Sequence, residues 1–423
     1  MSERPPPRLR EVDRQRVIPA MPLDGLLEGD HQARLVWAWC ERLDLAPLYD
    51  LVRSRVGGPG HPAIDPRICV ALWLYATLEG VGSARALALL CQEHNAFRRL
   101  AGGVSVNYHT LSDFRTAHLE FLDGLLTHSV AVLREQDLVD LNRVAIDGLR
   151  VRACAGAASF RRRQTLEEHA QEAKDQVARL KEELDDDPSA SSRRCAAARE
   201  RAARERQQRL QQALQRLPEL EAKKKPDEKD KARASTTDPQ ASVMKMADGG
   251  FRPAYNVQYA TATDGQVVLG VDVIGTGSDM GQISPMLDQI HERFDVRPAE
   301  ALADGGFASL DDIEQAQAAP RGATAYVPVP KPKDPNRDRH EPLPTDSEAV
   351  AQWRRRMKTE QAKEVYKQRA STIECVNAQA RNRGLLRLLV RGLLKVKAVA
   401  LWYAVAHNLG RWLGLRAEVE MAA

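Results

Sequence analysis

The sequence lacks the features that mark secreted, membrane-spanning and disulfide-stabilised proteins. Its six cysteines are scattered and form no Cys-x-x-Cys pair, which argues against a disulfide framework or a zinc ribbon. The first ten residues are polar and proline-rich, without the apolar centre of a signal peptide. Polar residues interrupt the longest apolar stretch, 393–409, so we predict no membrane span. We expect a soluble cytoplasmic protein.

Motifs for nucleotide cofactors are also missing. There is no G-x-x-x-x-G-K-[ST], no G-x-G-x-x-G that opens a helix after a strand, and no G-x-S-x-G. The ten histidines are dispersed without the spacing of metal ligands. A formal charge of +4 in 423 residues indicates polyanion binding only weakly, so the distribution of charge matters more than its total. A chain of this length predicts two or three domains.

The order of helical and strand-like segments predicts two folded regions. Residues 1–140 read as helices separated by loops, with Asp65-Pro66 as a helix start. From residue 141 onward strand-like runs alternate with helices and a long helix follows, which is the order of an RNase H-like α/β core with a mixed sheet. We assign 141–160 and 236–415 to this core and 416–423 to a tail. The strand-like runs lie at 144–151, 255–261, 266–274 and 324–329, and the helical stretches lie at 280–294 and 309–318.

Residues 161–235 interrupt the predicted core. Apolar residues from Leu166 to Leu184 recur at alternating intervals of four and three, which is the seam of a coiled coil. Asp187-Pro188-Ser189 should stop this helix, and a second helix with a compatible seam follows. We therefore predict an antiparallel helical hairpin that ends in a charged, disordered linker over 223–231. A solvated spacer arm is the favoured interpretation, and an arm that contacts DNA or forms a dimer is the alternative.

Three acidic residues stand in contexts that suit metal-assisted phosphoryl transfer. Asp147 and Asp304 each follow a short apolar strand, and Glu374 lies on a predicted long helix. In an RNase H-like sheet the first and fourth strands are neighbours, so the two aspartates should approach each other. Carboxylate oxygens are the ligands that Mg²⁺ prefers, and a pair of such ions supports in-line displacement at phosphorus. The alternative is that each Asp-Gly is only a turn, and Asp264-Gly265 between two strands fits that interpretation.

Basic residues surround the predicted glutamate. Tyr366, Arg369 and Arg381 are spaced to share a helix face with Glu374, where they could contact a DNA backbone. Further basic residues recur every four positions and predict a stripe along the same helix, with leucines on its other side: Arg383, Arg387, Arg391 and Lys395, opposed by Leu386, Leu389, Leu393 and Val396. A solvated helix face is the alternative. His407-Asn408 reads as a hydrogen-bonded pair in the core.

These residues, taken in order, resemble an insertion-sequence transposase of the DDE type with a Tyr-x-x-Arg…Glu…Lys signature. The resemblance covers nearly the whole chain. Three departures stand out: Leu149-Arg150 replaces the Thr-Lys that commonly follows Asp-Gly, Arg381 replaces the lysine, and Glu374 comes one residue late. The family-like segments are His61-Pro62, Asp65-Pro66, Leu78-Glu79-Gly80, Asn95-Ala96-Phe97-Arg98, His109-Thr110, Phe114-Arg115, Ile146-Asp147-Gly148, Thr237-Asp238-Pro239, Tyr255-Asn256-Val257-Gln258, Ala303-Asp304-Gly305-Gly306-Phe307 and His407-Asn408-Leu409.

The resemblance implies a function, a cofactor and partners. It implies catalytic and metal-binding roles for Asp147, Asp304 and Glu374, with Mg²⁺ as the cofactor and Mn²⁺ as its substitute. It also implies that the N-terminal helices bind terminal inverted repeats, that the enzyme cuts element ends and joins them to target DNA, and that a dimer or larger complex acts on the nucleoid. Two alternatives remain open, namely a silent DNA-binding derivative and a structure-specific nuclease on the same fold.

Overall fold

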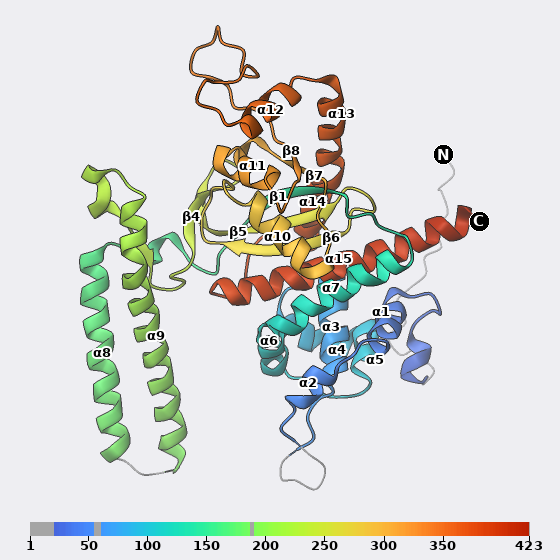
Figure 1. Cartoon of the computed structure of the whole chain (residues 1–423). Helices are drawn as coiled ribbons and strands as arrows, with labels where there is room; N and C mark the ends of the chain where they lie inside the picture. The colour runs from blue at the N-terminus through green and yellow to red at the C-terminus, as the bar shows by residue number, and fades with distance from the viewer. Residues whose placement is uncertain (1–20, 55–60, 187–189, 423) are drawn as a thin grey trace, which may run out of the picture.

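A computed structural model describes residues 21–54, 61–186 and 190–422 (Figure 1). The N-terminal region is helical, and Asp65 caps its central helix as predicted: the Asp65 Oδ1 accepts a hydrogen bond of 2.8 Å from the Arg67 amide. The elements are η1 (Leu23–Leu26), α1 (Gln32–Glu41), α2 (Ala46–Asp50), α3 (Pro66–Leu78), α4 (Ala84–Glu93), α5 (Asn95–Ala101), α6 (Tyr108–Ala117) and α7 (Leu119–Glu135).

A six-stranded mixed sheet forms the second region, which confirms the predicted RNase H-like α/β class. The order is β4-β5-β1-β7-β8, and β6 also pairs with β5. Strand β1 is antiparallel to β5 and parallel to β7. The strand that carries Asp147 and the strand that precedes Asp304 are therefore neighbours, as predicted. The elements are β1 (Arg143–Arg152), β4 (Ser242–Lys245), β5 (Phe251–Ala262), β6 (Val268–Ile274), α10 (Ile283–Phe294), β7 (Glu300–Ala303), η4 (Gly305–Phe307), α11 (Leu310–Gln317) and β8 (Thr324–Tyr326).

The interruption of the core is an antiparallel helical hairpin, as predicted. Helices α8 (Arg163–Asp186) and α9 (Ala190–Ala222) project together from the sheet region (Figure 1). Their seam is a small apolar core of its own, which includes Leu166, Ala173, Leu210 and Leu217. The predicted stop at 187–189 lies outside the described residues. The linker is more ordered than expected, because η3 (Pro226–Lys231) forms a 3-10 turn within it.

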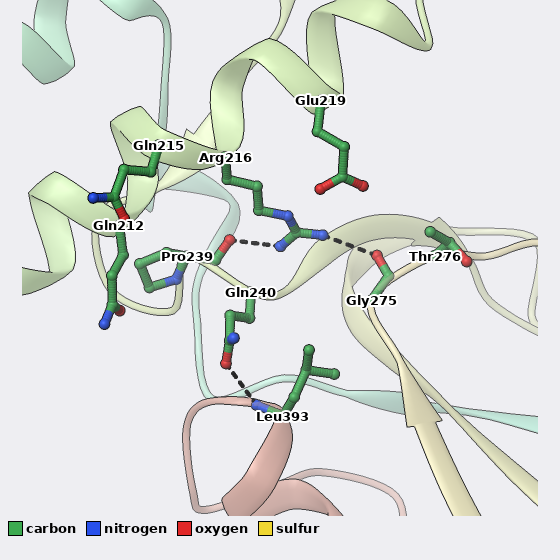
Figure 2. A pocket seen from close by; sticks show the side chains of 9 residues that line it. All are labelled: Gln212, Gln215, Arg216, Glu219, Pro239, Gln240, Gly275, Thr276 and Leu393. Carbon is green, nitrogen blue, oxygen red and sulfur yellow. Dashed lines mark hydrogen bonds between the residues drawn. The ribbon is translucent and has the colours of Figure 1, made fainter.

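A partly buried arginine joins the hairpin to the sheet (Figure 2). Two short strands, β2 (Phe160–Arg161) and β3 (Ala234–Ser235), pair at the hairpin base. Beside them the Arg216 guanidinium donates to the carbonyl oxygens of Pro239, at 2.5 Å, and Gly275, at 3.1 Å. Burial lowers the pKa of Arg216. These hydrogen bonds hold the Arg216 guanidinium in place and so fix the base of the hairpin relative to the sheet. The pocket in Figure 2 is therefore primarily the junction between the hairpin and the sheet.

The last helix connects the two regions. Helix α15 (Leu393–Ala422) packs against α3, α6 and α7 on one side and against β6 on the other. It is apolar on nearly all faces between residues 396 and 409 because both sides are covered by protein. Among the described residues no helix is long and apolar enough to cross a membrane. The preceding elements are α12 (Glu348–Arg356), α13 (Glu360–Arg369), the π-helical turn η5 (Ala370–Glu374) and α14 (Cys375–Asn382).

The predicted basic stripe on one continuous helix is wrong. Helix α14 ends at Asn382 and α15 begins at Leu393, and the segment between them is built of turns. Gly384 and Gly392 adopt φ values of +90° and +87°, which interrupt any helix. The four basic residues therefore do not form one face, and the predicted apolar side is also wrong: Leu386 and Leu389 are more than half exposed, whereas Leu385 and Leu388 are buried.

The predicted core pair on α15 is confirmed. The buried His407 Nε2 donates to the Gln266 carbonyl at 2.7 Å. The adjacent Asn408 amide exchanges two hydrogen bonds of 2.8 Å with the backbone of Val268. Both side chains thus act as hydrogen-bond partners for the backbone at the start of β6 and just before it, where the strand meets α15. Burial is the main cause that lowers the pKa of His407, to about 4.

This histidine should make the fold sensitive to mild acid. The unfolded chain binds a proton at His407 near pH 6.5, whereas the folded chain binds it only near pH 4, so stability is complete above pH 6.5 and falls as the pH is lowered. Between pH 7 and pH 5 we expect this residue to remove about 2 kcal/mol from the free energy of unfolding. Urea unfolding of wild type and His407→Gln at both pH values measures it. Equal losses in the two proteins would show that His407 is not the sensor.

Candidate active site

The first two acidic residues lie side by side on neighbouring strands of the sheet. Ile146 in β1 pairs with Ala303 in the parallel strand β7, and each of these residues is followed directly by an aspartate. Asp147 and Asp304 therefore occupy equivalent positions at one edge of neighbouring strands. Asp304 also caps the short turn η4, because its Oδ1 accepts a hydrogen bond of 2.7 Å from the Gly306 amide. The sheet thus brings together two carboxylates that are far apart in sequence.

Asp147 is partly buried, with 18% of its side chain exposed. Its Oδ1 accepts from the Gly148 amide at 2.9 Å, and its Oδ2 accepts from the Asn377 Nδ2 at 3.0 Å. Burial raises the pKa of the Asp147 carboxyl to about 6; the Arg369 guanidinium opposes this shift, and the negative charge of Asp304 adds to it. The protein thus holds this carboxylate where its charge is incompletely compensated.

An arginine links the third acid to the first. The Arg369 guanidinium lies with its Nη1 3.6 Å from the Asp147 Oδ2 and its Nη2 3.0 Å from the Glu374 Oε1. Its Nε lies 3.3 Å from the Tyr366 hydroxyl oxygen. The arginine side chain is 12% exposed, whereas Glu374 is 55% exposed and faces solvent beside it. One cation therefore stands between the strand-borne acid and the helix-borne acid.

Glu374 follows Arg369 by one residue more than in the family signature, and a π turn accommodates the extra residue. Residues five apart on an α-helix differ by about 140° around its axis, so Arg369 and Glu374 could not meet on a regular helix. The wider turn η5 places one extra residue between them and restores the contact. The hydroxyls of Ser371 and Thr372 both donate to the Gln368 carbonyl, at 3.1 and 2.7 Å. These bonds occupy the acceptor that a regular helix would use for the Thr372 amide.

The residues fit a divalent cation in their chemistry. Among the described residues no three His, Cys, Asp or Glu side chains already converge at metal-binding distance. However, Asp147 and Asp304 supply hard oxygen ligands on neighbouring strands, which is the donor chemistry that a divalent cation prefers. The Asn377 Oδ1 is buried and has no hydrogen-bond partner, which leaves one more oxygen ligand beside Asp147. Arg369 is the cation that currently lies between the acids.

The other predicted DNA-binding residues follow Glu374 along the chain. Arg381 is exposed near the end of α14, in the same helical arm as Glu374. Arg387, Arg391 and Lys395 are exposed beyond it, while Arg383 is partly buried and its carbonyl accepts from the Tyr403 hydroxyl at 3.0 Å. The rival Asp-Gly pairs at 248 and 264 both lie in turns.

Sequence reasoning missed the polar side chains that support the acids. Asn377 follows Glu374 by three residues and reaches Asp147, but an asparagine within a helix carries no distinctive signal. Asp279 lies in the irregular segment between β6 and α10, where its Oδ1 accepts from Asn256 and Gln258 of β5. The only available signal was the pair of polar residues within an otherwise apolar strand, because buried polar side chains need partners.

Comparison with known proteins identifies both regions. Residues 229–409 match the family model described as a transposase DDE domain, and residues 23–117 match one described as a transposase domain. The first match includes Asp304 and Glu374, whereas Asp147 precedes it. No curated protein and no solved structure matches the chain. These two matches show that the chain carries a transposase DDE domain and a second transposase domain, in agreement with its resemblance to insertion-sequence transposases of the DDE type.

Proposed function

We propose that this transposase cuts the ends of its own element to free 3′-hydroxyls and transfers them to target DNA. The carrying observation is the register of β1 and β7, which sets Asp147 and Asp304 side by side, with Glu374 tied to Asp147 through Arg369. In this proposal the three acids hold divalent ions, Mg²⁺ or Mn²⁺. When bound, these ions supply the Lewis acid that stabilises charge at the scissile phosphodiester.

The surrounding side chains orient the acids and the DNA in this proposal. Asn377 fixes the rotamer of Asp147 through its hydrogen bond, and Arg369 keeps Glu374 on the same side of the site. Arg369 is then free to pair with a phosphate once cations neutralise the acids. Exposed basic residues at the end of α14 and after it are assigned to the phosphate backbone, where they add affinity without base specificity: Arg381, Arg387, Arg391 and Lys395. Tyr366 and Arg383 are assigned to the same surface.

The two regions are assigned different roles in this proposal. We assign recognition of the terminal repeats to the helices before residue 140 and chemistry to the sheet. Two element ends must be joined to one target, so the working form is a dimer or a larger complex. The hairpin α8–α9 is assigned as an arm outside the catalytic core, since it carries its own apolar seam.

A single assay tests the proposal. Labelled duplexes that carry the repeats flanking the coding region are incubated with the protein in Mg²⁺, Mn²⁺ or EDTA at constant ionic strength, because phosphate contacts depend on salt. We expect cutting and joining in either metal, and binding alone in EDTA. An unrelated duplex is the control. Cutting without joining would replace the proposal by a nuclease, and binding without cutting in any metal would replace it by a silent DNA-binding protein.

A further inference from the structure

Two exposed arginines from distant parts of the chain lie side by side at the end of β1. Arg152 is the last residue of that strand and forms a parallel bridge with Arg387, which belongs to the segment between α14 and α15. The Arg152 amide donates to the Leu386 carbonyl at 3.1 Å, and the Leu388 amide donates to the Arg152 carbonyl at 2.8 Å. Paired residues of neighbouring strands lie about 5 Å apart. Both side chains are exposed, and neither forms an ion pair within the described ranges.

A third arginine approaches the same segment from the hairpin. Arg209, Gln212 and Arg216 are spaced by three and by four residues, so they share one face of α9. Gln212 and Arg216 line the pocket between the hairpin and the sheet, together with Leu393 at the start of α15 (Figure 2). Arg209 therefore lies on the face of α9 that is turned to the core, about two turns farther from the hairpin base than Arg216.

Arg209 has a like charge beside it and only weak compensation. Burial, and after it the positive charge of Arg391, lower the pKa of Arg209, so the two guanidinium groups are near enough to repel each other. The Arg209 Nε is buried and has no hydrogen-bond partner among the described residues. Its ion-pair partner Glu205 is 3.8 Å away on the same helix and is 71% exposed, and such a pair offsets little of the charge. The place is therefore suited to an anion that neutralises both arginines.

The loop at 238–240 holds the two repelling elements together. The Gln240 Oε1 accepts a hydrogen bond of 2.7 Å from the Leu393 amide, which fixes the start of α15. In the same loop the Pro239 carbonyl accepts a hydrogen bond of 2.5 Å from Arg216 of α9. Because one loop binds both elements, the like charges stay close in the free protein although they repel each other.

We propose that four arginines form one track for the phosphate backbone of duplex DNA, and that the hairpin contacts the duplex through it: Arg152, Arg209, Arg387 and Arg391. This deepens the proposed function, because it extends the DNA-binding surface from the core to α9. A guanidinium binds phosphate oxygens with charge-assisted hydrogen bonds, and a duplex presents phosphates in a regular series that suits arginines from three elements. The rival explanation is that the hairpin is a solvated spacer.

The track lies away from the proposed catalytic acids. Arg152 follows Asp147 by five residues on β1, which is about 17 Å along the strand. A change of charge in the track should therefore act on DNA binding and leave the acids as they are. Binding can be measured in EDTA, where no cleavage competes with it.

The test measures binding of the full chain to element-end and unrelated duplexes in EDTA over a range of salt concentrations. Each phosphate contact contributes about 0.9 to the slope of log affinity against log salt. For Arg209→Gln we expect this slope to decrease by about one, and the affinity at about 0.15 M salt to fall about fivefold on both duplexes. Arg209→Lys keeps the charge and should keep the slope. Arg179→Gln is the matched control, because it makes the same change at an exposed position of α8, the outer helix of the hairpin (Figure 1).

Several outcomes would overturn the track. A wild-type slope in Arg209→Gln would make the hairpin a spacer, and an equal loss in Arg179→Gln would reduce the effect to net charge. A loss on element ends alone would contradict contact with phosphates. Equal losses in Arg209→Gln and Arg209→Lys would assign the side chain to packing. If Arg209→Gln does not fold, Arg209→Glu decides, because it can pair with Arg391: the slope should decrease by about two, and a wild-type slope rejects the track.

These outcomes are separate from those of the proposed function. A wild-type protein that binds duplexes with the expected dependence on Arg209, yet cuts none of them in Mg²⁺ or Mn²⁺, would overturn the proposed chemistry and support the track. A wild-type protein that binds no duplex at low salt would overturn both.

Discussion

Asp147→Asn is expected to lower the rate of element-end cleavage by at least about a thousandfold while leaving end binding intact. A metal ligand contributes several kcal/mol to transition-state stabilisation, and each 1.4 kcal/mol is about a factor of ten in rate. The variant should also fold normally. Burial of this side chain disfavours its charged form by more than the contact with Arg369 favours it, so a neutral amide of the same shape should not destabilise the fold.

Cleavage, joining and end binding should be measured together with the melting temperature. Asp304→Asn and Glu374→Gln should behave alike. The control Asp272→Asn should cut at the wild-type rate, because Asp272 lies on β6 and pairs with Lys397. A cleavage rate near wild type in Asp147→Asn would remove this residue from the site. Full activity of Asp304→Asn alone would mean that the second strand-borne acid was misassigned.

Two single-residue deletions in one helical arm should have opposite results. Deletion of the exposed Ser371 removes the extra residue of η5, so a regular helix can join α13 to α14 and keep Arg369 and Glu374 on one face. We expect cleavage within about tenfold of wild type, as the site keeps its geometry. Deletion of the exposed Ala378 has no π turn to relieve it. It rotates one part of α14 against the other by about 100°, and a loss of at least about a hundredfold is expected.

The second deletion cannot be absorbed at the end of α14, because Gly384 packs closely there: a Cβ atom on it would lie 3.2 Å from the Gly80 carbonyl oxygen. The site residues before Ala378 must move instead. Circular dichroism establishes that both variants are folded before their rates are compared. If the Ser371 deletion lost as much activity as the Ala378 deletion, the π turn would be a required part of the site and not a tolerated insertion.

Local patterns predicted the elements whose signal is periodic. The hairpin seam and the apolar strand before Asp147 both follow from the side of each residue that must be buried, and the structure contains both. The four-residue spacing of Arg383, Arg387 and Arg391 is also periodic, but the continuous helix that it predicted is wrong. It resembles a helix face, but the backbone demands of Gly384 and Gly392 prevail over it.

Contacts between distant segments could not be read in advance. Arg152 and Arg387 are far apart in sequence, and their pairing depends on how the segment after α14 lies along β1. Likewise, the late position of Glu374 looked like a departure from the signature, yet a π turn corrects it through the hydroxyls of Ser371 and Thr372. The acids could be proposed from sequence, but their supporting partners required the tertiary structure.

Helix α15 has a consequence for synthesis of the protein. It follows every other described element along the chain, yet it covers apolar faces of both the N-terminal helices and the sheet. Until its residues leave the ribosome, both regions keep uncovered hydrophobic surface, which favours aggregation and degradation of incomplete chains. A premature stop anywhere before this helix should therefore yield no separately stable fragment of either region.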